Sequence, residues 1–117
     1  MRPNGLPRGN RLHLKRDFER IIQGGAKYQQ KGIVLWCTRT APFQKVRFAV
    51  VVSKKLGPAV VRNRTKRMLR EIFRTNKACF IPGVDMIVSP RDAETFCNAL
   101  AAQDALRTLW KTAALLK

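Results

Sequence analysis

The sequence predicts an α+β fold, a single-domain sandwich in which helices pack on one mixed sheet. Three segments repeat apolar side chains at helical spacing, and three short runs are rich in β-branched residues. Gly or Pro residues separate these segments. At 117 residues the chain is long enough for one hydrophobic core and too short for two. The expected order is helix, two or three strands, helix, strand, helix.

A first helix is predicted over residues 14–23. Its apolar side chains follow i, i+4, i+7, i+8 spacing: Leu14, Phe18, Ile21 and Ile22. The glycines at 24 and 25 end it. Two strands follow at 33–38 and 46–52, separated by Ala41-Pro42. In the second strand, alternate residues share one face: Val46, Phe48, Val50 and Val52.

A second helix is predicted from Gly57-Pro58 to about Lys77, with Gly57 as its cap and Pro58 in its first position. Its apolar face comprises Val61, Met68, Leu69, Ile72 and Phe73. After Pro82-Gly83, residues 84–89 form another short strand. Asp92 or Thr95 caps a last helix. The apolar residues of that helix are Phe96, Leu100, Leu106, Leu109, Trp110 and Ala113.

The charge of the chain predicts a polyanionic partner. There are 24 Lys and Arg against 7 Asp and Glu, a net charge of +17. Residues 1–77 hold 20 of the basic and three of the acidic residues, whereas residues 78–117 hold four of each. No run of 18 apolar residues and no signal peptide is present, so we expect no membrane contact and a cytoplasmic location. Residues 1–10 read as a flexible basic arm, and residues 11–117 as one domain.

The basic residues gather in one segment and predict a phosphate-binding helix. They are Lys54, Lys55, Arg62, Asn63, Arg64, Lys66, Arg67, Arg70 and Arg74, with Asn63 as the one uncharged member. Four of them are spaced four residues apart, from position 62 to position 74, and form one ridge. Like charges at this spacing destabilise a helix unless a partner compensates them. A phosphate backbone is such a partner.

No catalytic group is expected on the polypeptide. The seven acidic residues are scattered, whereas metal-dependent nucleases cluster their carboxylates. His13 is alone, so no acid–base pair of histidines exists. Cys37, Cys79 and Cys97 are widely spaced, which predicts neither a disulfide framework nor a zinc site. We therefore expect no cofactor or metal on the protein.

One stretch resembles a known family. Ser53-Lys54-Lys55, then Gly57, then Arg62-Asn63-Arg64-x-Lys66-Arg67-x-x-Arg70 is similar to the signature of the bacterial ribonuclease P protein. Arg11-Leu12 ahead of Asp17-Phe18 resembles the start of that family's first helix. The resemblance covers roughly residues 10–115. It implies the order helix, three strands, helix, strand, helix, with a left-handed crossover around the second helix.

The resemblance also implies a function. The chain would be the protein subunit of a ribonucleoprotein that removes the 5′ leader from precursor tRNA. The basic helix would bind the catalytic RNA subunit, whose bound Mg²⁺ ions perform the hydrolysis. The polypeptide alone would be inactive and need no obligate protein partner. A cleft between the sheet and the first helix would hold the single-stranded leader through Arg11, Phe18, Ile22, Trp36 and Phe48.

Two alternatives stay open at this point. Size and charge equally fit a structural RNA-binding protein such as a ribosomal protein. Only the Arg62–Arg70 motif and the Lys54-Lys55-x-Gly57 stretch before it argue against this alternative. A DNA-reading helix is disfavoured, because the ridge runs along the whole helix rather than placing a few polar readers at its start. From the residues alone, Phe18 and Trp36 fit an ordinary core as well as a cleft. Where the family often has a second aromatic residue, this chain has Ile22.

Overall fold

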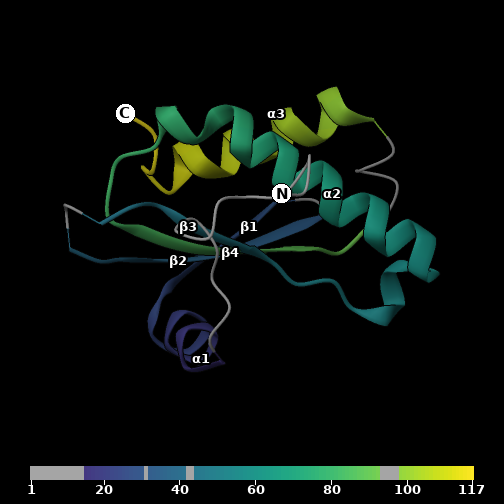
Figure 1. Ribbon diagram of the computed structural model, residues 1–117, viewed down its shortest axis with the longest axis horizontal. Helices are drawn as coiled ribbons and strands as arrows, with labels where there is room; N and C mark the ends of the chain where they lie inside the picture. The colour runs from purple at the N-terminus through teal and green to yellow at the C-terminus, as the bar shows by residue number, and fades with distance from the viewer. Residues whose placement is uncertain (1–14, 31, 42–43, 93–97) are drawn as a thin grey trace, which may run out of the picture.

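The computed structural model describes residues 15–30, 32–41, 44–92 and 98–117 (Figure 1). The elements, in order, are α1 (Lys15–Gly24), β1 (Ala26–Gln30), β2 (Ile33–Arg39), β3 (Arg47–Val50), α2 (Ala59–Asn76), β4 (Val84–Pro90) and α3 (Ala99–Thr112). Short 3-10 turns at Lys54–Leu56 and Lys77–Cys79 flank α2. The predicted α+β class and element order are confirmed. The proposed basic arm and Arg11 lie outside the described residues.

The four strands form an open mixed sheet in the order β1-β2-β4-β3. Strand β2 pairs antiparallel with both β1 and β4, while β3 and β4 run parallel. Parallel neighbours need a crossover, and α2 supplies it between β3 and β4. The left-handed sense that the resemblance implies for this crossover stays a prediction.

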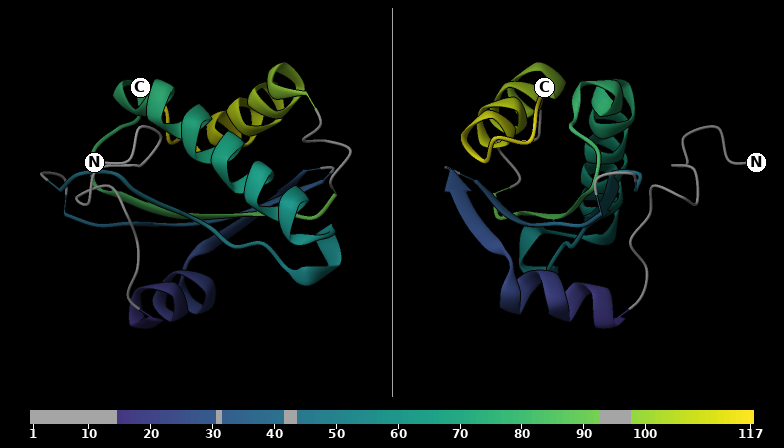
Figure 2. Two further views of the ribbon diagram at one scale, coloured as in Figure 1. Left: turned by 45° about the vertical axis from the view of Figure 1, so that its right-hand side comes forward. Right: turned by 90° about the vertical axis from the view of Figure 1, so that its left-hand side faces the viewer.

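The elements stack in three layers. Helices α2 and α3 lie together on one face of the sheet, and α1 lies alone on the other (Figures 1 and 2). Successive strand residues point to opposite faces. In β4, Val84, Met86 and Val88 therefore join the core under α2 and α3, while Ile87 packs toward α1. All seven residues of β4 are buried, as expected for a central strand with helices on both sides.

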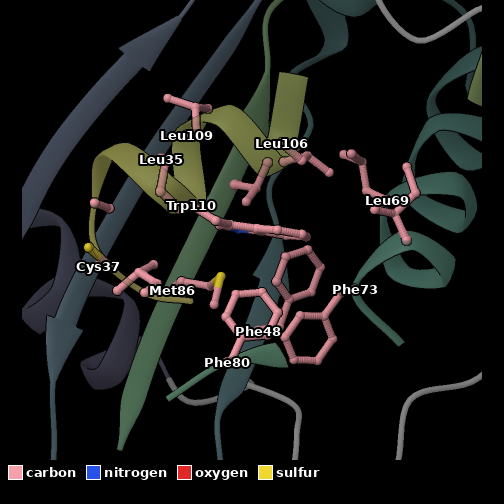
Figure 3. Close-up of a cluster of buried hydrophobic side chains, with 14 of the residues drawn as sticks. Leu35, Cys37, Phe48, Leu69, Phe73, Phe80, Met86, Leu106, Leu109 and Trp110 are labelled. Carbon is pink, nitrogen blue, oxygen red and sulfur yellow. The ribbon is translucent and has the colours of Figure 1, made fainter. Parts of the chain in front are cut away.

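The main core is a row of aromatic rings between the sheet and the two helices (Figure 3). Phe48 stacks on Phe73 with ring centroids 4.5 Å apart, and Phe73 meets Phe80 at 5.3 Å. Phe80 meets Trp110 edge-on at 4.6 Å. Such rings bury large apolar areas and dominate the energetics of a core. The second helix is thus fixed to the sheet through Phe73, which leaves its other side to solvent.

The structure corrects four details. Helix α2 begins at Ala59 with Pro58 as its N-cap, so Gly57 is not its cap and Pro58 is not its first residue. Strand β1 was not located in the sequence, because Ala26–Gln30 is a mostly polar edge strand that pairs with β2 alone. Helix α3 is capped by Asn98, whose Oδ1 accepts from the Leu100 N–H at 2.8 Å, so Asp92 is not its cap. Leu100, expected on the apolar face, is 74% exposed. Thr95 and Phe96 lie outside the described residues.

Candidate nucleic-acid interface

The predicted basic ridge exists on α2. The apolar residues of α2 face the core, so the opposite side carries Asn63, Arg67 and Arg70 into solvent. Arg62 and Lys66 are half-buried along the edge of the helix. The Arg62 Nε is buried without an acceptor in the described part of the chain.

The other members of the predicted set differ in ion pairing and in exposure to solvent. Arg74 donates from Nε to Glu71 at 3.0 Å and also pairs through its terminal nitrogen. This hydrogen bond lowers the pKa of Glu71 and raises the pKa of Arg74. Much of the Arg74 charge is therefore compensated within the helix. Lys54 and Lys55 are exposed on the turn before α2. Arg64 is exposed but lies about 200° around the helix from Arg62, off the ridge.

The face of the sheet under α1, called the α1 face below, is only partly covered. Ile21 packs on Ala49 and Ile87, and the half-buried Phe18 and Trp36 border this small cluster. Two apolar side chains of the adjoining segments are exposed: Ile22 of α1 at 44%, and Val51, which directly follows β3, at 41%. Of the predicted leader-binding residues, Phe18, Ile22 and Trp36 thus gather on one surface.

Two cations flank Trp36 that the sequence reasoning did not identify. The Lys27 Nζ lies 5.9 Å from the ring centroid, and the Arg91 guanidinium carbon lies 5.8 Å from it. Both distances are within the range of cation–π attraction. Lys27 is the cross-strand partner of Trp36 in the β1–β2 pairing. No sequence signal could place it there without the register of a strand that had not been located.

Phe48 does not belong to this surface, and its assignment to the leader-binding cleft was wrong. The side chain is buried on the opposite face of the sheet and stacks on Phe73. The physical reason is strand alternation: its neighbours Arg47 and Ala49 point toward α1, so Phe48 points toward α2.

A cluster of charges ties α1 to the sheet. Asp85 on β4 is 0% exposed and receives two hydrogen bonds from Arg47, at 2.8 Å to Oδ1 and 2.6 Å to Oδ2. Arg20 of α1 donates to the same Oδ2 at 2.7 Å and to the Thr38 hydroxyl at 3.1 Å. Asp17 lies 3.4 Å from Arg20 and 3.7 Å from Arg47. Two guanidiniums thus meet two carboxylates, and this cluster serves to position α1.

Neither the acidic residues nor the thiols assemble a metal site in the part of the chain that is described. No group of three His, Cys, Asp or Glu lies close enough there to hold an ion. Burial raises the pKa of the Cys37 thiol, and Cys79 is exposed. Among the described helices, none is both long and apolar enough to cross a bilayer.

The fold and its two surfaces define a class of protein. A basic helix supplies phosphate contacts on one side of an α+β sheet, and a half-exposed aromatic residue between cations offers a stacking platform on the other. This combination is typical of a small protein that binds nucleic acid chiefly by contacting the sugar–phosphate backbone and by stacking on the faces of the bases.

The chain belongs to the ribonuclease P protein family. The family model described as Ribonuclease P matches residues 6–114. The "Ribonuclease P protein component" of Dictyoglomus turgidum is 32% identical over 115 residues, which is 96% of this chain and 95% of that protein. A solved RNase P protein from Staphylococcus aureus aligns with a TM-score of 0.82 at 30% identity, over 92% of this chain and 98% of that one. The RNase P protein from Thermotoga maritima aligns with a TM-score of 0.79 at 35% identity, over 87% of this chain and 96% of that one.

Proposed function

We propose that this chain acts in ribonuclease P by binding two RNA segments at once, the catalytic RNA subunit and the 5′ leader of precursor tRNA. One observation carries the proposal. The basic ridge on α2 and the aromatic α1 face lie on opposite sides of one rigid sheet. A protein that only bound the outside of a folded RNA would need the basic ridge and not the aromatic α1 face.

The ridge suits the RNA subunit. Arg62, Lys66 and Arg70, with Arg67 beside them, project from one continuous helix, which spaces positions four residues apart by about 6 Å along its axis. Guanidinium groups bind phosphate oxygens through two parallel hydrogen bonds, so several of them on one rigid helix fix an RNA backbone in place. Each phosphate contact also releases counterions, which favours assembly at low salt.

The α1 face suits a single strand. Trp36 can stack on a base of any identity, and Lys27 and Arg91 beside it can neutralise the flanking phosphates. Ile22 and Val51 extend the surface with apolar rather than aromatic side chains. We therefore infer a grip on the leader that depends weakly on its sequence.

Hydrolysis itself is assigned to the RNA subunit and the Mg²⁺ ions bound to it. The polypeptide would contribute positive charge and positioning, with no cofactor of its own and no catalytic side chain. It would act in the cytoplasm, where precursor tRNA is made. Because the protein replaces screening cations between two polyanions, the reaction should run at lower Mg²⁺ concentration when the protein is present.

The test is reconstitution from the purified chain, its RNA subunit and a precursor tRNA. The protein alone should not cleave, the RNA alone should cleave only at high Mg²⁺, and the mixture should cleave at near-physiological ionic strength. The double variant Arg62→Ala/Arg67→Ala should lose binding to the RNA subunit, with a salt dependence flatter by about two units of slope. Lys15→Ala/Arg16→Ala removes two exposed charges from α1 and serves as the control.

Three outcomes would contradict the proposal. One is unaltered RNA affinity in the folded Arg62→Ala/Arg67→Ala variant, which would remove the ridge from the interface. Another is cleavage of precursor tRNA by the protein without RNA. A loss of 10²–10⁴-fold in the chemical step from a folded, RNA-bound variant of one acidic residue would also count against it, since that is the effect of removing a general acid or base.

A further inference from the structure

We propose that the end of the molecule where α2, α3 and the C-terminal tail meet is a second phosphate-binding surface, and that it contacts the RNA subunit next to the ridge. We call it the end surface, and its cations are Lys45, Lys77, Arg107, Lys111 and Lys117. The identity of the RNA rests on the proposed function. The surface itself rests on the geometry that follows.

The tail is fixed where it can shape this surface. The Ile81 N–H donates to the Leu115 carbonyl at 2.9 Å, and the Lys117 N–H donates to the Cys79 carbonyl at 2.8 Å. These bonds hold the tail along residues 79–81, so the C-terminus lies beside the end of α2 in both ribbon views (Figures 1 and 2). Lys117 consequently lines two hollows.

The two hollows have basic linings. The first, of about 370 Å³, is lined by Cys79, Arg107, Lys111, Leu116 and Lys117. The second, of about 430 Å³, includes Lys45, Lys77 and Lys117 in its lining. Among the described residues, no acidic side chain lines either of them. Each is large enough to admit a phosphate group with its water.

One cation of the end surface is held in place by a buried amide. The Arg107 guanidinium donates to the Oδ1 of Asn76 at 2.6 Å. Asn76 is buried at the end of α2, and its Nδ2 donates to the Ile72 carbonyl at 2.7 Å. Arg107 is therefore anchored across the α2–α3 contact, with further N–H donors left for a ligand.

Three of the five cations of this surface come from a segment that carries no net charge. Residues 78–117 hold four basic and four acidic residues. Asp85 is buried on the other face of the sheet against Arg20 and Arg47, so its charge does not reach the end surface. Asp104 lies one turn before Arg107 on α3 and lines neither hollow. Arg107, Lys111 and Lys117 line the first hollow together.

Helix geometry joins the end surface to the ridge. Lys77 follows Arg70 by seven residues and Lys66 by eleven, which on an ideal helix places Lys77 within about 20° of each of them. Helix α2 ends at Asn76, whose φ is −109° and ψ is 1°, and Lys77 opens the following 3-10 turn with φ −62° and ψ −28°. From Arg62 to Lys77 the rise is about 22 Å. An RNA backbone that follows the ridge would thus arrive at the end surface.

The chemistry of the end surface favours phosphates over bases. Its aromatic neighbour Phe80 is buried in the core and offers no ring for stacking. Lysine ammonium groups act as point charges toward phosphate, without the planar geometry that reads base edges. We infer contacts to a folded RNA backbone that are independent of sequence, unlike the aromatic grip on the α1 face.

A charge-matched pair of variants tests the proposal. Lys111→Ala/Lys117→Ala removes two cations from the end surface, and Lys15→Ala/Arg16→Ala removes two from α1. Binding of the full chain to the RNA subunit, without substrate, is measured over a salt series. The end-surface variant should flatten the salt dependence by about two units of slope, and the α1 variant should not. Thermal unfolding confirms that both variants fold.

The outcomes separate this proposal from the proposed function. If both variants lose affinity equally, only net charge matters and the end surface is not a site. If the end-surface variant binds like the unaltered chain while Arg62→Ala/Arg67→Ala fails to bind, the end surface is excluded and the ridge stands. If neither the end-surface variant nor Arg62→Ala/Arg67→Ala loses affinity, the proposed RNA-binding function fails as well.

A second measurement needs no loss of charge. Cys79 is exposed in the first hollow, whereas Cys37 is buried. In a Cys97→Ser background, an iron–EDTA group tethered to Cys79 should cleave the backbone of the bound RNA subunit at defined positions. The reference is Arg16→Cys with Cys79→Ser, which carries the probe on α1. Cleavage no stronger than that from untethered iron–EDTA would show that the end surface faces away from the RNA.

Discussion

The two faces of the sheet use the same strands and opposite chemistry. Toward α2 and α3, Val84, Met86 and Val88 of β4 are fully buried in an apolar core. Toward α1, the same strand presents Asp85 in a charge cluster and Ile87 in a small apolar cluster. The two faces therefore differ in role. The face toward α2 and α3 stabilises the fold, whereas the face toward α1 buries less apolar surface and leaves part of itself accessible.

The largest expected effect lies on the core face. Phe48→Ala should lower the free energy of unfolding by about 3–5 kcal/mol, because it removes a buried ring stacked on Phe73 and leaves a cavity. Ile22→Ala on the exposed side of α1 should cost less than about 1 kcal/mol. Urea denaturation measures both. Equal losses would mean that the two faces contribute alike to stability.

The charge cluster should contribute next. Asp85→Ala leaves Arg20 and Arg47 without their buried partner and should cost about 2–3 kcal/mol. This is below the usual cost of breaking a buried pair, because the two arginine side chains are 43% and 28% exposed to water. The control Asp104→Ala, on the exposed side of α3, should change stability by less than about 0.5 kcal/mol. A neutral Asp85→Ala would show that the cluster does not hold α1.

Trp36 should separate binding from stability. Trp36→Ala should lower the affinity for leader-bearing precursor tRNA by about 1–3 kcal/mol, since one stacking platform is lost. Mature tRNA, which has no leader, should bind about as before. Stability should fall much less than for Phe48→Ala. Equal loss for both ligands, or unfolding, would instead place Trp36 in the core.

A pair of adjacent glycines gives the smallest predicted effects, with opposite signs. A Cβ on Gly25 would lie 2.4 Å from the Ile21 carbonyl oxygen and 2.6 Å from that of Cys37, so Gly25→Ala must push α1 from β2. We expect a loss of about 1–2 kcal/mol. At Gly24 a Cβ meets nothing within 4 Å, and Gly24→Ala should stabilise by about 0.5 kcal/mol. Thermal unfolding of the two variants measures both effects. A loss of stability in Gly24→Ala would show that the close approach at Gly25 is not what makes a Cβ destabilising here.

Much of the fold was predictable, for identifiable reasons. Apolar spacing located α1 and α2, and β-branched runs located β2 and β4, because these elements bury a continuous stripe or strand. Strand β1 escaped because an edge strand with exposed Lys27 and Gln29 carries no apolar alternation. The cap of α3 was misplaced because several residues near its start have capping side chains.

The site was predictable only where neighbours in sequence suffice. The ridge on α2 depends on one helix, so residue spacing located it. The α1 face depends on which side of the sheet α1 occupies, and alternation within β3 cannot decide that for Phe48. Lys27 and Arg91 reach Trp36 only through strand pairing and the end of β4. The end surface was hidden for the same reason, because it joins residues from α2, α3 and the tail.

The attachment of α1 gives the α1 face a motion of its own. Ile21 is the one fully buried residue of α1, so few apolar contacts oppose its release. Segments of this kind open locally, on a faster timescale and at a lower free energy than the whole molecule. The amide protons of α1 should therefore exchange with solvent well before those of β4. A strand of RNA bound between α1 and the sheet would suppress this local opening. Binding should therefore slow the exchange of the amide protons of α1 and leave the other elements unchanged.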